Sequence, residues 1–61
     1  MNFGERLREL RGDRTIEEVT SSTLISPDAY EAYERGDRMP PEAVKQLLAD
    51  YYKVRVEDIW R

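Results

Sequence analysis

Residues 15–36 read TIEEVTSSTLISPDAYEAYERG, and this stretch predicts two helices joined by a short turn. Thr15 and Glu18 have the spacing of a capping box, in which each side chain satisfies a backbone donor at a helix start. The run Ser26-Pro27-Asp28 predicts the second start, because serine caps, proline suits the first helical position and an acid suits the positive end of the helix dipole. Gly36 predicts the end of this helix, since glycine adopts the left-handed conformation without strain.

The segments on either side predict further helices. A first helix runs from about Phe3 to Arg11, because Asn2 and Glu5 have the spacing of another capping box and Gly12 is a natural stop. A fourth helix opens at Pro40-Pro41-Glu42, and its apolar residues recur at the spacing of a buried stripe. They are Val44, Leu47, Leu48, Tyr51 and Tyr52.

The remaining apolar residues complete one small core. Tyr30 and Tyr33 are expected to point inward, and a last turn or short helix holds Val56, Ile59 and Trp60. No stretch alternates with period two, no segment repeats and no linker is long enough to divide the chain. We therefore predict an all-α fold, a compact bundle of about five short helices, in a single domain over residues 1–61.

Composition narrows the classes of function. The 61 residues include no cysteine and no histidine, which removes disulfides, thiolate metal sites, the commonest metal ligand and the commonest general base. No glycine-rich phosphate loop or metal-spaced carboxylates appear, so we expect neither an enzyme nor a metal or other cofactor. No apolar run approaches the roughly 20 residues that span a bilayer, and we expect a cytoplasmic protein with no membrane partner.

Three segments at fixed mutual spacing resemble the lambda-repressor-like (Cro/xenobiotic-response-element) helix-turn-helix family. They are FGERLRELR over residues 3–11, YERGDR over residues 33–38 with Pro40 beyond, and VRVEDIW over residues 54–60. The resemblance implies a helix-turn-helix unit over about residues 15–35. It also implies a bidentate, partly buried ion pair between Arg11 and Glu34, which joins the first helix to the recognition helix.

The same resemblance implies a DNA-binding transcriptional regulator that acts on double-stranded DNA as a homodimer. The positions that match the family's base contacts are Pro27, Asp28, Glu31 and Ala32. The chain departs from the family in the reading unit: Thr20 replaces a small residue, Leu24 replaces the usual turn glycine, and Ile16 replaces a glutamine that touches the DNA backbone.

The charges leave two functions open. Residues 15–34 carry Glu17, Glu18, Asp28, Glu31 and Glu34 without one base, although Arg14, Arg35 and Arg38 flank the unit. These arginines either grip phosphates or are ordinary solvated loop charge, while Thr15 and Ser26 are neutral candidates for DNA contact. Asp28 and Glu31 could accept from cytosine amino groups, but carboxylates oppose the long-range attraction to a polyanion. The alternative function is a protein-interaction module whose acidic third helix docks onto a basic protein partner.

Overall fold

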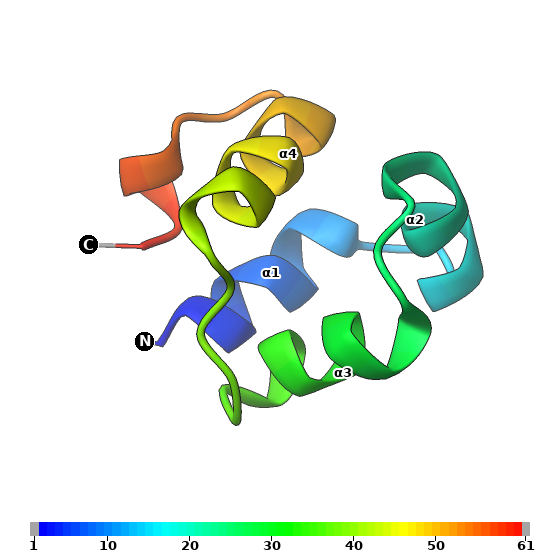
Figure 1. Ribbon diagram of the computed structural model, residues 1–61. Helices are drawn as coiled ribbons and strands as arrows, with labels where there is room; N and C mark the ends of the chain where they lie inside the picture. The colour runs from blue at the N-terminus through cyan, green and yellow to red at the C-terminus, as the bar shows by residue number, and fades with distance from the viewer. Residues whose placement is uncertain (1, 61) are drawn as a thin grey trace.

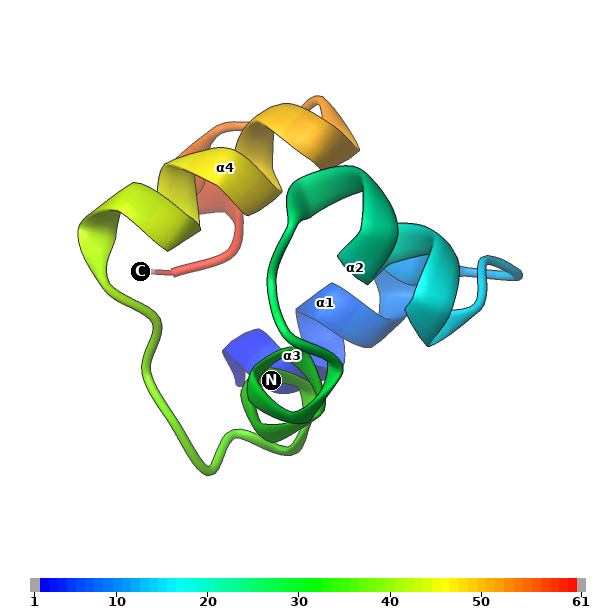
Figure 2. The same ribbon diagram turned by 45° about the vertical axis from the view of Figure 1, so that its right-hand side comes forward.

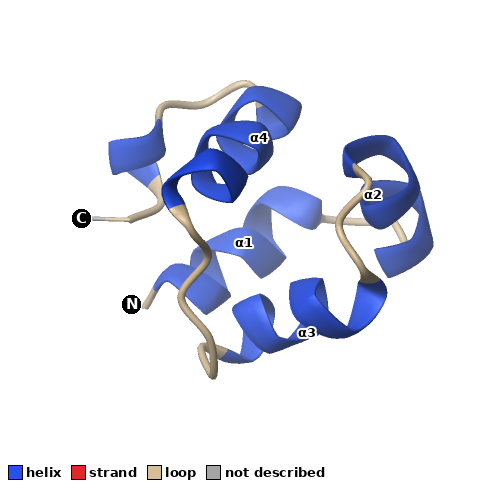
Figure 3. Ribbon diagram, viewed as in Figure 1, coloured by secondary structure: helices blue, strands red, loops and turns tan. Residues whose placement is uncertain are grey.

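Four α-helices and one turn of 3-10 helix make up the computed structural model, which describes residues 2–60 (Figure 1). The helices are α1 (Phe3–Arg11), α2 (Ile16–Thr23), α3 (Pro27–Arg35) and α4 (Glu42–Tyr52), followed by the 3-10 helix η1 (Val56–Asp58). No strand occurs within the described residues (Figure 3), so the all-α prediction is confirmed. Within this range the fifth element is a single 3-10 turn, so the number of α-helices is four instead of the predicted five or so. None of the helices in residues 2–60 combines the length and apolar character needed to cross a bilayer.

The helix starts lie where the capping residues predict them. Capping boxes form at Asn2 with Glu5 and at Thr15 with Glu18, and the Ser26 hydroxyl accepts a hydrogen bond from the Ala29 amide at 3.2 Å. Gly36 ends α3 in the left-handed conformation, with φ 78°. These interactions span at most a few residues of chain, which is why the sequence alone predicts them.

Helix α1 lies between α3 and α4 in both views (Figures 1 and 2). Helix α3 packs on α1 and α2, while α4 packs on α2 and η1. The largest fully buried side chains come from all four helices: Leu7, Val19, Tyr30 and Leu48. Tyr33 is buried beside them, so both tyrosines of α3 point inward as predicted.

The predicted stripe on α4 is wrong at one position. Leu47 is 42% exposed, whereas Leu48, Ala49 and Tyr52 are buried. Each residue advances about 100° around a helix, so Leu47 is turned away from the face that Leu48 and Ala49 present to the core. The apolar residues of α4 extend around more of the helix than the part that is buried in the core.

Gly4 is the point where the backbones of α1 and α3 meet. A Cβ atom on Gly4 would overlap the Glu34 carbonyl oxygen and would lie 2.8 Å from the Glu34 carbonyl carbon and 3.0 Å from the Tyr33 carbonyl oxygen. These obstacles are backbone atoms, which cannot rotate away as a side chain can. Only glycine therefore allows the two helices to approach this closely.

Leu24 occupies the turn between α2 and α3 in a conformation that favours glycine. Its φ is 62° and ψ is 22°, and its amide donates to the Thr20 carbonyl at 2.8 Å to end α2. Its side chain is 90% exposed. The leucine therefore carries the strain of a left-handed backbone without gaining buried contacts.

We predict that Gly4→Ala lowers the free energy of unfolding by about 3 kcal/mol, because α1 and α3 must separate to admit the methyl group. Urea unfolding followed by circular dichroism measures the change. The matched control is Gly36→Ala, where the atom nearest to an added Cβ within residues 2–60 is the Asn2 side-chain nitrogen at 4.0 Å. The cost of about 1 kcal/mol at Gly36 comes from the left-handed φ. In an unobstructed helix the same exchange stabilises by about 1 kcal/mol, so a gain at Gly4 would contradict the close approach.

We predict the opposite sign at the turn, where Leu24→Gly raises the free energy of unfolding by about 1 kcal/mol by relieving the left-handed strain. For a domain of this size the melting temperature should rise by about 4 to 8 °C. Leu24→Ala is the control, since it removes the same exposed apolar surface but keeps a Cβ at positive φ. Equal effects of glycine and alanine would show that the backbone conformation is not the cause.

Candidate nucleic-acid interface

The outward face of α3 is formed by Pro27, Asp28, Glu31 and Arg35, which are all exposed. The opposite side of the helix carries Tyr30, Tyr33 and Glu34 into the interior. Helix α3 lies on the far side of α1 from α4 (Figures 1 and 2), and the exposure of these residues shows that no other helix of residues 2–60 covers the outward face.

Ala32 does not belong to this face. It is only 5% exposed, although the family resemblance places it among the base-contacting positions. The reason is the rotation of the helix, which turns Ala32 by about 100° from Glu31 and toward the interior. Its methyl group is therefore unable to reach a base edge, and the expectation for Ala32 is wrong.

Thr15 and Ser26 stand exposed at the starts of α2 and α3. The Thr15 hydroxyl accepts from the Glu18 amide at 3.0 Å, and the Ser26 hydroxyl accepts from the Ala29 amide. A hydroxyl that accepts in this way still has a proton to donate. Each side chain can therefore cap its helix and hydrogen-bond to an external acceptor at the same time.

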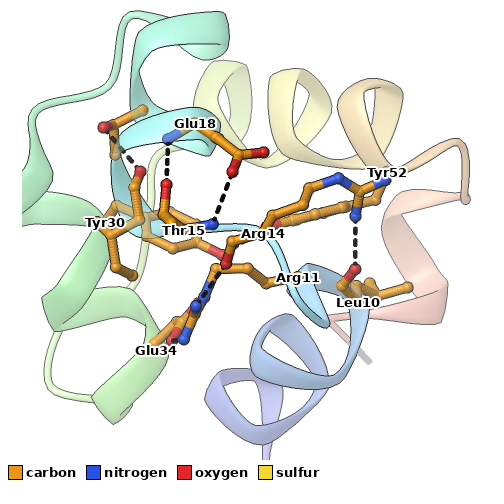
Figure 4. Close-up of polar contacts among 10 residues, drawn as sticks. Leu10, Arg11, Arg14, Thr15, Glu18, Tyr30, Glu34 and Tyr52 are labelled. Carbon is orange, nitrogen blue, oxygen red and sulfur yellow. Dashed lines mark hydrogen bonds and ion pairs between the residues drawn. The ribbon is translucent and has the colours of Figure 1, made fainter.

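The Arg14 side chain turns toward α4 and away from α3 (Figure 4). Its Nη1 donates to the Leu10 carbonyl at 2.9 Å, and its guanidinium carbon lies 5.6 Å from the ring centres of both Tyr51 and Tyr52. These contacts occupy the guanidinium on the side of the molecule opposite the outward face of α3. Of the three flanking arginines, Arg14 is thus the one whose side chain is held away from the outward face of α3.

Arg35 is the last residue of the outward face, and Arg38 lies just beyond the end of α3. The Arg35 Nε donates to Asp37 at 2.9 Å, and this hydrogen bond raises the pKa of Arg35, with further contributions from Glu31 and Asp28. Arg38 lies 5.9 Å from the centre of the Tyr33 ring and forms no ion pair with any residue in 2–60. Of the two arginines, Arg38 is therefore the one whose charge is not offset by an acidic side chain of residues 2–60.

The acids of the helix-turn-helix unit separate into two groups. Glu34 is 7% exposed and pairs with Arg11, while Glu17, Glu18, Asp28 and Glu31 remain exposed. Within residues 2–60, no group of three or more acidic, histidine or cysteine side chains is placed to hold a metal ion. Because four of its five acids are exposed, the surface of the unit is acidic in the structure as well as in the sequence.

Arg11 and Glu34 make a two-pronged contact between α1 and α3 (Figure 4). Arg11 Nε donates to Glu34 Oε2 at 2.7 Å, and Arg11 Nη2 donates to Oε1 at 3.1 Å. The remaining Nη1 donates to the Arg14 carbonyl at 2.8 Å, which ties the loop between α1 and α2 to the same guanidinium. The hydrogen bond with Glu34 raises the pKa of Arg11, so the guanidinium stays charged.

A buried hydrogen bond joins α3 to α4 through two tyrosines. The hydroxyl oxygens of Tyr30 and Tyr52 lie 2.6 Å apart. Burial is the main cause that raises the pKa of each hydroxyl above its ordinary value, so both remain protonated at neutral pH. The sequence predicts both residues as packed aromatics but carries no signal that their hydroxyls meet, because the two lie on different helices.

The sequence is similar to known helix-turn-helix proteins. A profile described as a helix-turn-helix domain matches residues 2–59. The chain belongs to the helix-turn-helix domain family. One relative is the cryptic phage CTXphi transcriptional repressor RstR of Vibrio cholerae, which is 30% identical over 59 residues that cover 93% of this chain.

The alignment covers 53% of that repressor, so this helix-turn-helix chain spans about half the length of the curated relative it matches. No solved structure gives a significant match. The assignment to the family is therefore based on the match to the domain profile and on the similarity to the repressor, and both agree with the resemblance seen in the sequence.

We predict that Arg11→Ala and Glu34→Ala each lower the free energy of unfolding by about 3 kcal/mol, because each leaves a largely buried charge without its partner. The double variant should cost less than the sum of the two, with a coupling energy of about 1 to 2 kcal/mol in a double-mutant cycle. The exposed pair Arg6 and Glu9 is the matched control, and its coupling should stay below about 0.5 kcal/mol. Additive effects at Arg11 and Glu34 would contradict an energetically coupled pair.

Proposed function

We propose that this helix-turn-helix domain binds double-stranded DNA and acts as a transcriptional regulator, with α3 in the major groove. The observation that carries the proposal is the uncovered outward face of α3 in a member of this family. The related protein from Vibrio cholerae is named a transcriptional repressor, which supports the same class of function. A major groove about 12 Å wide admits one helix of this kind.

The contacts divide by chemistry. Pro27, Asp28 and Glu31 lie where the first turns of α3 would face base edges. Thr15 and Ser26, with their free hydroxyl protons, and the cations Arg35 and Arg38 lie at the edges of this face and suit phosphate oxygens. Arg14 is a weaker candidate for phosphate, since its guanidinium already meets a carbonyl and two aromatic rings.

A homodimer is the assembly that fits this mode of binding. Helix-turn-helix dimers place their two reading helices about 34 Å apart, one turn of DNA. The domain measures 26 × 22 × 22 Å between its Cα extremes. Two copies therefore fit in successive major grooves on one face of the duplex without overlapping, with room for side chains between them.

The charge distribution favours a second candidate function. Glu17, Glu18, Asp28 and Glu31 are exposed on the helix-turn-helix unit, and no base of residues 15–34 offsets them. An acidic face of this kind complements a basic protein surface, and long-range attraction would bring the two together. The alternative is therefore an interaction module that docks on a basic protein partner.

A nuclear magnetic resonance titration of the 15N-labelled chain with short duplex DNA tests the first proposal. We expect amide shifts between Ser26 and Ala32 and an affinity that falls steeply with salt, because phosphate contacts release counterions. Glu31→Lys should raise the affinity for random duplex and steepen the dependence of log K on log salt by about one unit.

The control is Glu57→Lys, which makes the same change of charge on the exposed surface of η1 and should leave DNA binding nearly unchanged. Absence of any shift at low salt would overturn the DNA-binding proposal. In that case, binding of a lysine- and arginine-rich peptide by the original chain, abolished by Glu31→Lys, would support the interaction module.

A further inference from the structure

The carboxylate of Glu31 has no partner among residues 2–60. It is exposed near the middle of α3, and it makes no side-chain hydrogen bond or ion pair with any residue in 2–60. Arg35 follows at i+4 in the orientation that favours an ion pair on a helix. The structure places Arg35 elsewhere, because its Nε donates to Asp37 at 2.9 Å.

The other exposed acids of the unit have local roles that Glu31 lacks. Asp28 lies in the first turn of α3 and Glu17 in the first turn of α2, where the positive end of each helix dipole stabilises a carboxylate. Glu18 accepts from the Thr15 amide as part of the capping box of α2. Glu31 lies beyond the first turn of α3, so neither the dipole nor a cap accounts for it.

The major groove offers few groups that a carboxylate can bind. Guanine presents the acceptors N7 and O6, and thymine presents the acceptor O4 and a methyl group, so these bases repel or ignore a carboxylate. Adenine has a donor at N6, but its acceptor N7 lies beside it. Cytosine presents its N4 amino group without a neighbouring acceptor on the same base.

We propose that Glu31 is a specificity-determining residue, which accepts a hydrogen bond from the N4 amino group of a cytosine in each half of the DNA site. This inference rests on the proposed function, since it names the base that the same face of α3 selects. The flanking Arg38, which pairs with no acid in residues 2–60, supplies positive charge that lets a carboxylate approach the duplex.

The energetic role of Glu31 is then rejection of incorrect sequences. A carboxylate lowers attraction to every duplex, because the phosphates repel it at long range. At an incorrect base the same carboxylate would lose its water and face an acceptor, whereas at cytosine it gains a hydrogen bond. Glu31 thus reduces overall affinity but increases the ratio between correct and incorrect sites.

Selection from a randomised duplex library, with binding at low salt and sequencing of the enriched pool, tests the inference. The intact chain should enrich cytosine at one position of each half-site, and replacing that base should weaken binding by about 5- to 150-fold. Glu31→Gln should change the preference at that position to adenine, because an amide pairs with adenine N6 and N7. Glu31→Ala should remove the preference there and leave the other positions unchanged.

Glu17→Gln is the matched control, since it removes the same charge from the exposed surface of α2 and should leave the selected sequence unchanged. Enrichment by the intact chain of a site that Glu31→Gln selects equally well, with no position altered, would overturn the role of Glu31 alone. Failure of the intact chain to retain any duplex at low salt would overturn the DNA-binding proposal and this inference together, whereas retention of duplex without enrichment at any position would overturn the role of Glu31 alone. The two failures are therefore distinguishable in one experiment.

Discussion

Glu34 contacts α1 twice, and the rest of the structure depends on this double contact. Its backbone carbonyl lies against Gly4, where no Cβ fits, and its carboxylate receives two hydrogen bonds from Arg11. Gly4 and Arg11 are separated by about two turns of α1. Contacts at two points along one helix limit both the sliding and the rotation of the other. They therefore determine which side chains of α3 face outward.

A small core makes such polar contacts important. A chain of 61 residues buries only about 60% of the surface that its unfolded state exposes, so apolar packing leaves a narrow margin of stability. Buried polar pairs contribute less net energy than their short distances suggest, because each group loses its water. Their geometry is nevertheless specific: the Arg11 fork and the hydroxyl pair of Tyr30 and Tyr52 align α1, α3 and α4.

The helix-turn-helix scaffold and its acidic surface obey different physical constraints. The scaffold depends on interior contacts that the outward side chains do not touch, so the exposed face of α3 is free to vary in charge. In this chain Arg14 is held against Tyr51 and Tyr52, while Glu31 is exposed and pairs with no residue of the described range 2–60. If the domain binds DNA as proposed, the long-range attraction to the phosphates is weak as a result, and short-range contacts in the groove then supply the selectivity.

The sequence by itself determined the local structure. The capping residues Asn2, Thr15 and Ser26 predicted three helix starts, because a cap acts within about three residues. The resemblance to the family likewise predicted the ion pair between Arg11 and Glu34. Only the tertiary structure decided that Leu47, expected in the core, is exposed and that Ala32, expected on the surface, is buried. It also decided that α1 and α3 approach each other most closely at Gly4 and that Arg14 turns toward α4. These features depend on contacts between segments far apart in the chain, and neither capping nor helical periodicity specifies how much of a helix its neighbours cover.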